Sequence, residues 1–358
     1  MKKLFYKSGL LSFLALVLLA TTVAAQEVTK EYHKEYKADA KTTLDISNKY
    51  GDVIITGWNN NQVVIDVKVT VDVPGQDRAQ KLLDMIDVKF TEGTDLITAK
   101  TVIDNKFNFS IWSGQKKFSI DYTVKMPYVT NLDLANRYGN SDIDELRGLV
   151  NLNIKYGNIN VGKLTRGNED PINKISLEYG KGTFEETGWL DMYVRYSGAV
   201  TIDNSQALLI DSKYSKLRIG ETSSVVGEAK YDTYGIDKIN NLVLSSGYTT
   251  VNVGSLAKKL EFEGSYGSLT VEDIPTSFES VDVDVRYTGV RLGIAESASY
   301  KLDGESSYGG IKFDEDKFNY QKRIVENNSS EMTGVVGKEK SPSATVKIST
   351  SYGTVKLY

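Results

Sequence analysis

The chain has 358 residues, enough to bury a large core, and its lack of cysteine excludes disulfide crosslinks, thiol nucleophiles and thiolate metal ligands. Its formal net charge of −4 argues against nucleic acid as a partner. The single histidine, His33, stands in a charged stretch and is interpreted as a surface residue. Ser-His-Asp catalysis and histidine-based metal sites are therefore nearly excluded.

Residues 1–25 have the order of a secretory signal peptide. Two lysines at 2–3 precede an apolar run over 10–20, and residues 23–25 are small, as at a cleavage site. A transmembrane anchor is the alternative, but the run is shorter than the roughly 20 apolar residues that a spanning helix needs. We therefore predict an exported protein without a transmembrane span, located in the periplasm or at the cell surface.

Residues 26–130 are predicted to form an N-terminal β-rich cap that includes the first repeat unit. Residues 63–73 alternate apolar and polar side chains and predict a long strand. Residues 76–86 have helical composition, and further strands are expected near 96–102 and 118–126. Because a stack of strands exposes apolar core at its ends, we interpret this region as a cover for one end.

A tyrosine recurs at nearly regular intervals through the rest of the chain. Between residues 138 and 308 successive tyrosines of this series are 17 to 23 residues apart, which is typical of a β-solenoid repeat. The series consists of Tyr50, Tyr138, Tyr156, Tyr179, Tyr196, Tyr214, Tyr231, Tyr248, Tyr266, Tyr287, Tyr308 and Tyr352.

Each repeat unit reads as two short strands around a corner. Leu152 and Ile154 alternate with polar residues up to Tyr156, and Ile159 and Val161 alternate again after it. The next apolar residue lies three positions after the tyrosine rather than two, so the alternation is interrupted there and the backbone must bend. We assign this bend to the glycine that often follows the tyrosine. The tyrosine shares the parity of the inward residues, which predicts a structural column; carbohydrate stacking on the rings is the alternative.

One such unit cannot bury its apolar face alone, so neighbouring units must stack. The sequence thus predicts an all-β fold, a single-stranded solenoid with Tyr-Gly-centred rungs over residues 131–358. A polar, glycine-containing segment near 315–345 interrupts the repeat. We expect this insertion to loop out or to cover the last rungs.

The order of the motifs resembles an exported β-strand-repeat "putative adhesin" family, a domain of unknown function related to the head-domain adhesins of Bacteroidetes. The resemblance implies a right-handed, β-helix-like fold outside the cytoplasm, and it implies no catalytic residues. The motifs that carry it are Leu44-Asp45-Ile46-Ser47-Asn48, Tyr50-Gly51, Val53-Ile54-Ile55, Gly57-Trp58, Tyr122-Thr123-Val124-Lys125-Met126-Pro127 and the Tyr-Gly rungs that follow.

Two charged columns are expected on the outside of the stack. A cation often precedes the repeat tyrosine, and acids often follow it by six or seven residues. Solvated faces that keep the protein soluble are one interpretation. The other is that the basic column binds anionic glycan or lipid headgroups and the acidic column binds Ca²⁺. The candidate ligand-binding cations are Lys49, Arg137, Lys155, Arg195, Lys213, Lys230 and Arg286, and the candidate metal ligands are Glu185, Asp203, Glu221 and Asp237.

A third candidate is the aromatic segment that contains Phe107, Phe109 and Trp112. If exposed, these side chains would form a contact patch. A hairpin packed on the cap is the alternative.

These features favour a non-catalytic, extracytoplasmic, adhesin-like binding or scaffold protein without a cofactor, whose partner is an anionic glycan or an envelope component. One alternative is a polysaccharide-processing enzyme, with Asp282 and Asp284 beside Arg286 as its best carboxylate pair. A purely structural envelope protein is the other. The sequence leaves the oligomeric state open.

Overall fold

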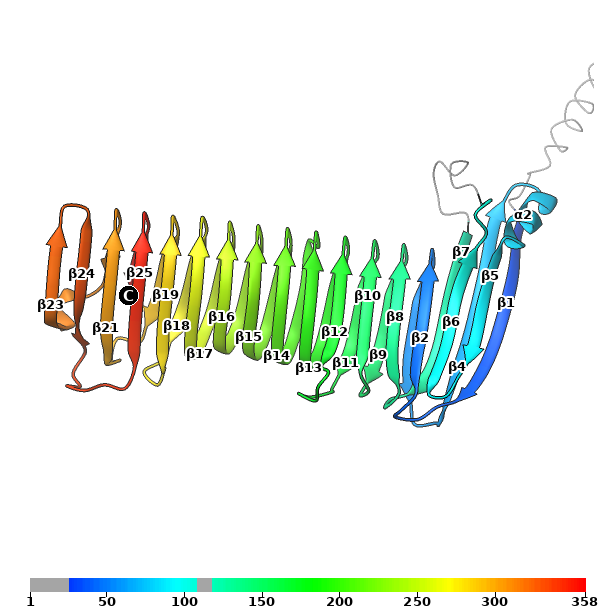
Figure 1. Cartoon of the computed structure of the whole chain (residues 1–358), viewed down its shortest axis with the longest axis horizontal. Helices are drawn as coiled ribbons and strands as arrows, with labels where there is room; N and C mark the ends of the chain where they lie inside the picture. The colour runs from blue at the N-terminus through cyan, green and yellow to red at the C-terminus, as the bar shows by residue number, and fades with distance from the viewer. Residues whose placement is uncertain (1–25, 108–117) are drawn as a thin grey trace, which may run out of the picture.

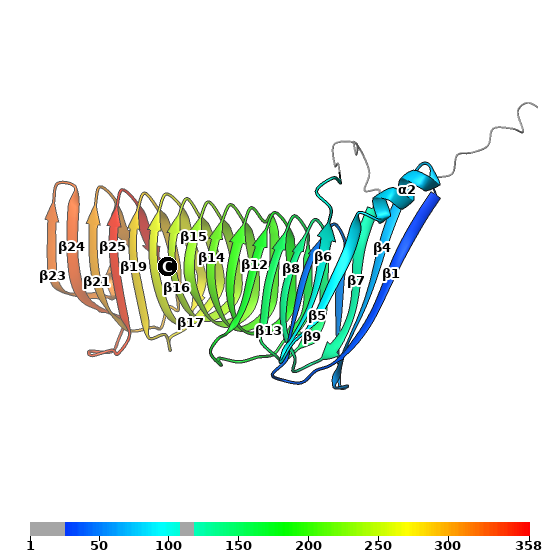
Figure 2. The same ribbon diagram turned by 45° about the vertical axis from the view of Figure 1, so that its right-hand side comes forward.

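A computed structural model describes residues 26–107 and 118–358, and within them the protein is all-β. Its 26 strands form one long open sheet, seen in Figures 1 and 2 as a row of strands lying side by side. The α-helix of the described residues is α2 (Gln76–Leu83), and η2 (Glu315–Lys317) is a 3-10 turn. No helix in these ranges is both long and apolar enough to cross a membrane. The predicted all-β class with one helix is confirmed.

The strands fall into three groups along the chain. The N-terminal strands are β1 (Gln26–Lys37), β2 (Thr43–Lys49), β3 (Val53–Trp58), β4 (Gln62–Val73), β5 (Ile86–Glu92), β6 (Leu96–Ile103) and β7 (Phe118–Pro127). The strands of the central repeat are β8 (Asn131–Arg137), β9 (Ser141–Leu146), β10 (Val150–Lys155), β11 (Ile159–Leu164), β12 (Asn173–Glu178), β13 (Lys181–Arg195), β14 (Ala199–Lys213), β15 (Lys216–Lys230), β16 (Thr233–Gly247), β17 (Thr250–Ser265), β18 (Ser268–Ile274), β19 (Ser280–Arg286) and β20 (Gly289–Ile294). The C-terminal strands are β21 (Tyr300–Ser307), β22 (Gly310–Lys312), β23 (Phe318–Glu326), β24 (Ser329–Val336), β25 (Thr345–Ser351) and β26 (Thr354–Leu357).

Each rung consists of a first limb that leads into a repeat tyrosine and a second limb that leaves it. First limbs pair in parallel with first limbs of the neighbouring rungs, and second limbs pair with second limbs. In the long strands β13 to β17 the second limb of one rung continues into the first limb of the next, as β13 and β14 do along their whole length. The repeat therefore builds two parallel ladders that run the length of the array.

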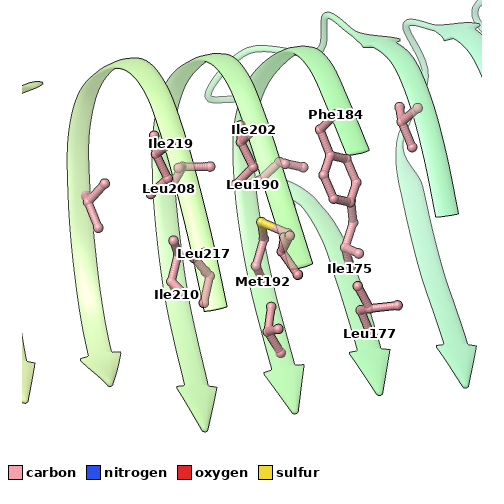
Figure 3. Close-up of a cluster of buried hydrophobic side chains, with 14 of the residues drawn as sticks. Ile175, Leu177, Phe184, Leu190, Met192, Ile202, Leu208, Ile210, Leu217 and Ile219 are labelled. Atoms are coloured by element: carbon pink, nitrogen blue, oxygen red, sulfur yellow. The ribbon is translucent and has the colours of Figure 1, made fainter. Parts of the chain in front are cut away.

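The core lies between the two limbs of each rung. Figure 3 shows side chains of both limbs filling this space, among them Phe184 and Ile202 on second limbs and Met192 on a first limb. All three are fully buried. Because strand side chains alternate between two faces, every second residue of a limb points into this space and its neighbours point out.

At the N-terminal end the chain makes an excursion between two rungs that are adjacent in the sheet. The first and second limbs around Tyr50 pair directly with those around Tyr138, although residues 59–130 separate them in sequence. In that excursion β6 and β7 extend the two ladders, and β4 and β5 pair antiparallel with β7 and β6. β1, which comes earlier in the chain, pairs antiparallel with β4. Figure 2 shows α2 at this end, beside β1 and β4. The predicted strands at 63–73, 96–102 and 118–126 are confirmed as β4, β6 and β7.

At the C-terminal end the spatial order of the rungs differs from their order in sequence. β25 pairs with β19 on one side and with β21 on the other, and β26 lies likewise between β20 and β22. Figure 1 shows β25 between β19 and β21. Beyond β21 the ladder continues with β24 and β23, both antiparallel, which form much of the segment 315–345. The rung made last in the chain is therefore an internal one.

Backbones approach closely at the first corners of the array. A Cβ added to Gly139 would lie 1.8 Å from the carbonyl oxygen of Gly51, and one added to Gly157 would lie 1.8 Å from that of Gly139. Glycine is required there by this close approach. The sequence-based assignment of the unusual backbone conformation to these glycines is wrong, because the positive φ angle belongs to the tyrosine before each of them.

Candidate functional site

The repeat tyrosines form one continuous ladder along the edge where the two limbs meet. Neighbouring ring centroids are 4.7–5.1 Å apart and the ring planes differ by 3–16°. The predicted tyrosine column is thus confirmed. In spatial order its members are Tyr50, Tyr138, Tyr156, Tyr179, Tyr196, Tyr214, Tyr231, Tyr248, Tyr266, Tyr287, Tyr352 and Tyr308.

Every tyrosine of the ladder has a left-handed backbone conformation, with φ between 50° and 67°. This conformation turns the side chain out of the corner, so eleven of the twelve rings have 40–61% of their surface exposed. The inward orientation expected from sequence parity is wrong for this reason. Within the ladder the flat faces of the rings are covered by neighbouring rings, so the exposed surface of these tyrosines lies mainly at the ring edges.

Stacking offsets part of the strain of these corners. A left-handed backbone costs a non-glycine residue roughly 1–2 kcal/mol. An aromatic pair contributes about 0.5–1.5 kcal/mol beyond the burial of its surface, and inner tyrosines of the ladder belong to two pairs. With eleven stacked pairs among twelve tyrosines, stacking offsets part of this strain and keeps the outward edge of the ladder regular.

We expect Tyr196→Gly to destabilise the protein less than Tyr196→Ala, by about 1 kcal/mol. Both substitutions remove the stacked ring, but glycine adopts the positive φ of this corner without strain and alanine does not. Urea unfolding of the two variants measures the difference. Equal stabilities would show that the corner does not hold this conformation in solution.

A buried polar network supports the middle of the ladder from inside. The Asp232 carboxylate accepts hydrogen bonds from Ser212 Oγ at 2.7 Å, from the Ser215 backbone N–H at 2.6 Å and from the Lys230 backbone N–H at 2.9 Å. Ser212 Oγ also lies 2.6 Å from the hydroxyl of the fully buried Tyr234. Burial raises the pKa of Asp232, because the charged form loses hydration. These bonds fix neighbouring corners relative to one another.

The predicted cations occupy one register position immediately before the ladder. Lys49, Arg137 and Lys155 are consecutive in the pairing, and Glu178 follows them. Arg195, Lys213 and Lys230 form a second consecutive set. Two neutral residues separate Lys230 from Arg286, which lies further along the same row. The structure thus brings the seven predicted cations into one row with gaps, which we call the ladder row.

The cations of the ladder row differ in how far they are neutralised. Lys155 Nζ lies 2.9 Å from Glu178, Arg195 Nη2 lies 2.7 Å from Asp211, and Lys230 Nζ lies 3.8 Å from Glu228. The hydrogen bond that Lys155 donates to the Glu178 carboxylate raises the pKa of Lys155. Among the described residues no carboxylate lies within 4 Å of the remaining cations. These are Lys49, Arg137, Lys213 and Arg286, of which Lys213 and Arg286 lie over tyrosine rings of the ladder at 5.2 and 5.4 Å.

The structure does not bring the four predicted metal ligands into one row. The pairing aligns Glu221 with Asn204 and Lys238, one position away from the row of Asp203 and Asp237. The intervening rung carries Gly220 between those two acids. Arg218 is within 3.0 Å of Asp237. In the ranges that the structure describes, no group of three or more histidine, aspartate or glutamate side chains is placed to hold a metal ion.

The aromatic segment is described only at its first residue. Phe107 is buried and packs edge-on against Phe118, with the ring centroids 5.1 Å apart. It therefore does not belong to an exposed patch, which corrects the contact-patch interpretation at this position. Phe109 and Trp112 lie outside the described residues.

Sequence reasoning missed a polar groove of about 450 Å³ at the second corner, where second limbs continue into the next first limbs. Most rungs contribute two or three residues to it, and these are chemically varied, so they form no visible motif. Lys238 and Glu221 lie 3.9 Å apart within it. The side chains along the groove include those of Glu186, Asn204, Gln206, Glu221, Ser223, Lys238, Asn240 and Ser255.

The carboxylate pair weighed for an enzyme lies on the outer face of β19. Asp282 and Asp284 are both exposed. The pairing places Lys347 of β25 opposite Asp282 and Ser349 opposite Asp284. Asp282 therefore has Lys347, a residue of the intercalated strand, directly opposite it in the sheet.

No family model matches this chain, and no curated protein matches it. Solved structures similar to it include a "putative cell adhesion protein" from Clostridium sporogenes, at 11% identity over 92% of this chain and 99% of that one, with a TM-score of 0.20. A "putative lipid binding protein" from Parabacteroides distasonis is 12% identical over 75% of this chain and 96% of its own, with a TM-score of 0.33. A "putative adhesin" from Bacteroides fragilis is 12% identical over 92% of this chain and 97% of its own, with a TM-score of 0.25. The names agree with the resemblance found in the sequence, and TM-scores this low carry no argument about function.

Proposed function

We propose that this protein is a non-catalytic binding or scaffold protein of the extracytoplasmic space that holds a linear anionic glycan along its tyrosine ladder. The observation that carries the proposal is the ladder row. It places two sets of three cations on consecutive rungs beside an unbroken line of tyrosine hydroxyl groups.

The ladder recognises such a ligand through its edges. Because the ring faces are stacked on one another, sugar rings cannot lie flat on them within the column. The exposed edges instead offer hydroxyl groups, each able to donate one hydrogen bond and accept others. One hydroxyl group per rung, about 4.8 Å apart along the array, suits a ligand that is itself extended and repetitive.

The ladder row adds charge to this recognition. Cations on adjacent rungs act together on a polymer whose charges also repeat, so binding is expected to be stronger than for a single anion. The cations without a carboxylate partner contribute most, since no internal ion pair has to be broken. Exposed charges are screened by salt, so affinity should fall as ionic strength rises.

The proposal includes a cellular location and a more detailed fold. The protein is exported with removal of residues 1–25 and acts in the periplasm or at the cell surface. Residues 26–130 serve as the cap of a right-handed, β-helix-like solenoid over 131–358, interrupted near 315–345. The parallel one-rung register of the two ladders supports this fold. N-terminal sequencing of the secreted or periplasmic protein tests the cleavage, and a native N-terminus at Met1 would overturn it.

Glycan binding is tested by calorimetry of the chain from residue 26 against polygalacturonate, a sulfated dextran and neutral dextran. We expect salt-sensitive binding of an anionic polymer and none of neutral dextran. The triple variant Lys49→Glu, Arg137→Glu, Lys213→Glu should bind at least tenfold more weakly. A control with the same charge change at exposed lysines outside the ladder row is Lys37→Glu, Lys81→Glu, Lys340→Glu, and it should retain more of the affinity.

A second variant isolates the hydroxyl groups. Replacing Tyr196, Tyr214 and Tyr231 by phenylalanine keeps the stacked rings, so the melting temperature should change little while glycan affinity falls. Binding that is unchanged in both this variant and the charge reversal would overturn the proposal. Shortened glycan products would instead indicate the enzyme alternative, and an absence of any glycan binding would favour a purely structural envelope protein.

A further inference from the structure

Three cations meet on the second limbs at the C-terminal end of the array. The pairing places Arg291 of β20 directly opposite Lys356 of β26, and Lys356 directly opposite Lys312 of β22. All three side chains are exposed on the outer face of the sheet. We call this set the cation triad. It exists because β26 lies between β20 and β22, so that Lys356 becomes the neighbour of Arg291 and of Lys312, which lie 65 and 44 positions before it in sequence.

On other second limbs, oppositely charged residues of neighbouring rungs form ion pairs. Lys163 pairs with Glu186 at 3.1 Å and Arg218 with Asp237 at 3.0 Å, and in each pair the two residues come from adjacent rungs. Like charges directly opposite one another on paired strands are destabilising. The triad places two such contacts side by side, and no carboxylate of the described residues lies within 4 Å of any of its nitrogens.

Two acidic side chains on or just after the second limbs beside the triad are engaged by other groups. Glu272 accepts a hydrogen bond from the hydroxyl of Tyr358 at 3.2 Å, and Asp314 forms an ion pair with Lys317 at 3.2 Å. The ring of Tyr358 lies beside the triad, with Arg291 at 5.1 Å and Lys356 at 5.6 Å from its centroid. These contacts orient two of the three cations and leave their charge without an anionic partner.

We propose that the cation triad is a binding site for a ligand with several phosphate or sulfate groups, separate from the ladder row. Arginine and lysine are the side chains that bind such tetrahedral oxyanions, arginine through paired N–H donors and lysine as a point charge. With rungs about 4.8 Å apart, the triad spans roughly 10 Å, which exceeds the reach of one oxyanion. A ligand with two or more linked oxyanions can contact all three cations.

The site differs from the ladder row in position and in origin. The ladder row lies on first limbs, one residue before the tyrosines, whereas the triad lies on second limbs, four residues after Tyr287, Tyr352 and Tyr308. Substitutions at one set therefore leave the other set unchanged. The two proposals can fail independently.

The test compares the chain from residue 26 with its triad variant Arg291→Thr, Lys312→Thr, Lys356→Thr. Threonine is chosen because other rungs carry it at this register position, as Thr270, Thr201 and Thr183. Inorganic tripolyphosphate and a sulfated oligosaccharide are the probes, and inorganic phosphate is the single-oxyanion comparison. We expect both probes to raise the melting temperature of the parent chain and to bind the variant at least tenfold more weakly. Inorganic phosphate should bind more weakly than tripolyphosphate.

Two further measurements make the result decisive. Without ligand at low salt, the variant should melt no lower than the parent chain, because it has lost two repulsive contacts. The ladder variant Lys49→Glu, Arg137→Glu, Lys213→Glu should retain a tripolyphosphate response greater than that of the triad variant. If the ladder variant binds carboxylate polymers as tightly as sulfated ones, the ligand class assigned to the triad is overturned. Equal binding of tripolyphosphate by the parent chain and the triad variant, or no binding by either, would overturn the site itself.

Discussion

Removal of residues 345–358 is expected to detach the segment 300–336 from the rest of the sheet while the rungs before residue 294 stay folded. The removed strands are the parallel partners of β21 and β22 on their inner side. Their inward side chains Val346, Ile348, Val355 and Leu357 are all buried, and each contributes about 1.5–3 kcal/mol by burial. Together this is about 6–12 kcal/mol, comparable with the whole stability of a typical domain.

Hydrogen exchange read by mass spectrometry gives the outcome segment by segment. In the truncated chain the amides of residues 300–336 should exchange at least a hundredfold faster, and those of residues 199–265 should change little. A matched control replaces the outward residues Thr345 and Lys347 by serine, which removes no buried surface. Continued protection of residues 300–336 after truncation would show that β21 pairs directly with β19 when β25 is absent.

Gly139→Ala is expected to destabilise the protein by more than 3 kcal/mol, and Gly157→Ala by a similar amount. In each case the added Cβ would lie 1.8 Å from a backbone oxygen of the next rung, a position that real Cβ atoms do not occupy. The neighbouring backbones would have to separate, which lengthens the ladder hydrogen bonds on both limbs at this corner. Chemical denaturation with circular dichroism detection measures the loss.

Gly198→Ala is the matched control for this prediction. Gly198 also lies at a tyrosine corner, but nothing lies within 4 Å of the position of its Cβ. The substitution should be neutral or stabilise by a few tenths of a kcal/mol, since alanine restricts the unfolded chain. If Gly139→Ala and Gly198→Ala had the same effect, the close approach of backbones at the first corners would be refuted.

The repeat was predictable from sequence because every rung buries apolar residues at the same alternating positions around its tyrosine. The alternation around Tyr156 gives Leu152 and Ile154 one inward face, and the structure buries both. The direction of the tyrosine itself was not predictable by counting parity. Parity assumes an extended backbone up to the tyrosine, and the positive φ at that residue turns its side chain outward.

The acidic residues show a second case in which strict alternation along a strand predicts the wrong neighbours. At the end of a second limb two successive residues point outward, as Glu185 and Glu186 do. Acids found six or seven residues after a tyrosine therefore belong to two different rows. Only the pairing register separates Glu221 from Asp203 and Asp237.

The sequence also could not predict which rungs lie next to each other in the sheet. Every limb has the same alternation, so nothing in residues 345–357 distinguishes a position after β21 from a position between β19 and β21. The interval of 44 residues from Tyr308 to Tyr352 is close to two periods and fits either arrangement. For this reason Lys356 could not be grouped with Arg291 and Lys312 before the structure was known.

The internal position of the last rung also sets an order of events during folding. Residues 300–312 come before residues 345–357 in the chain, yet they lie outside them in the sheet. Until the later residues insert, the edges of β19 and β20 and the facing edges of β21 and β22 remain unpaired. Unpaired strand edges readily accept strands from other chains. Exchange of the last rung between two copies is therefore most favoured in this interval, and it depends on protein concentration during folding rather than on the stability of the finished array.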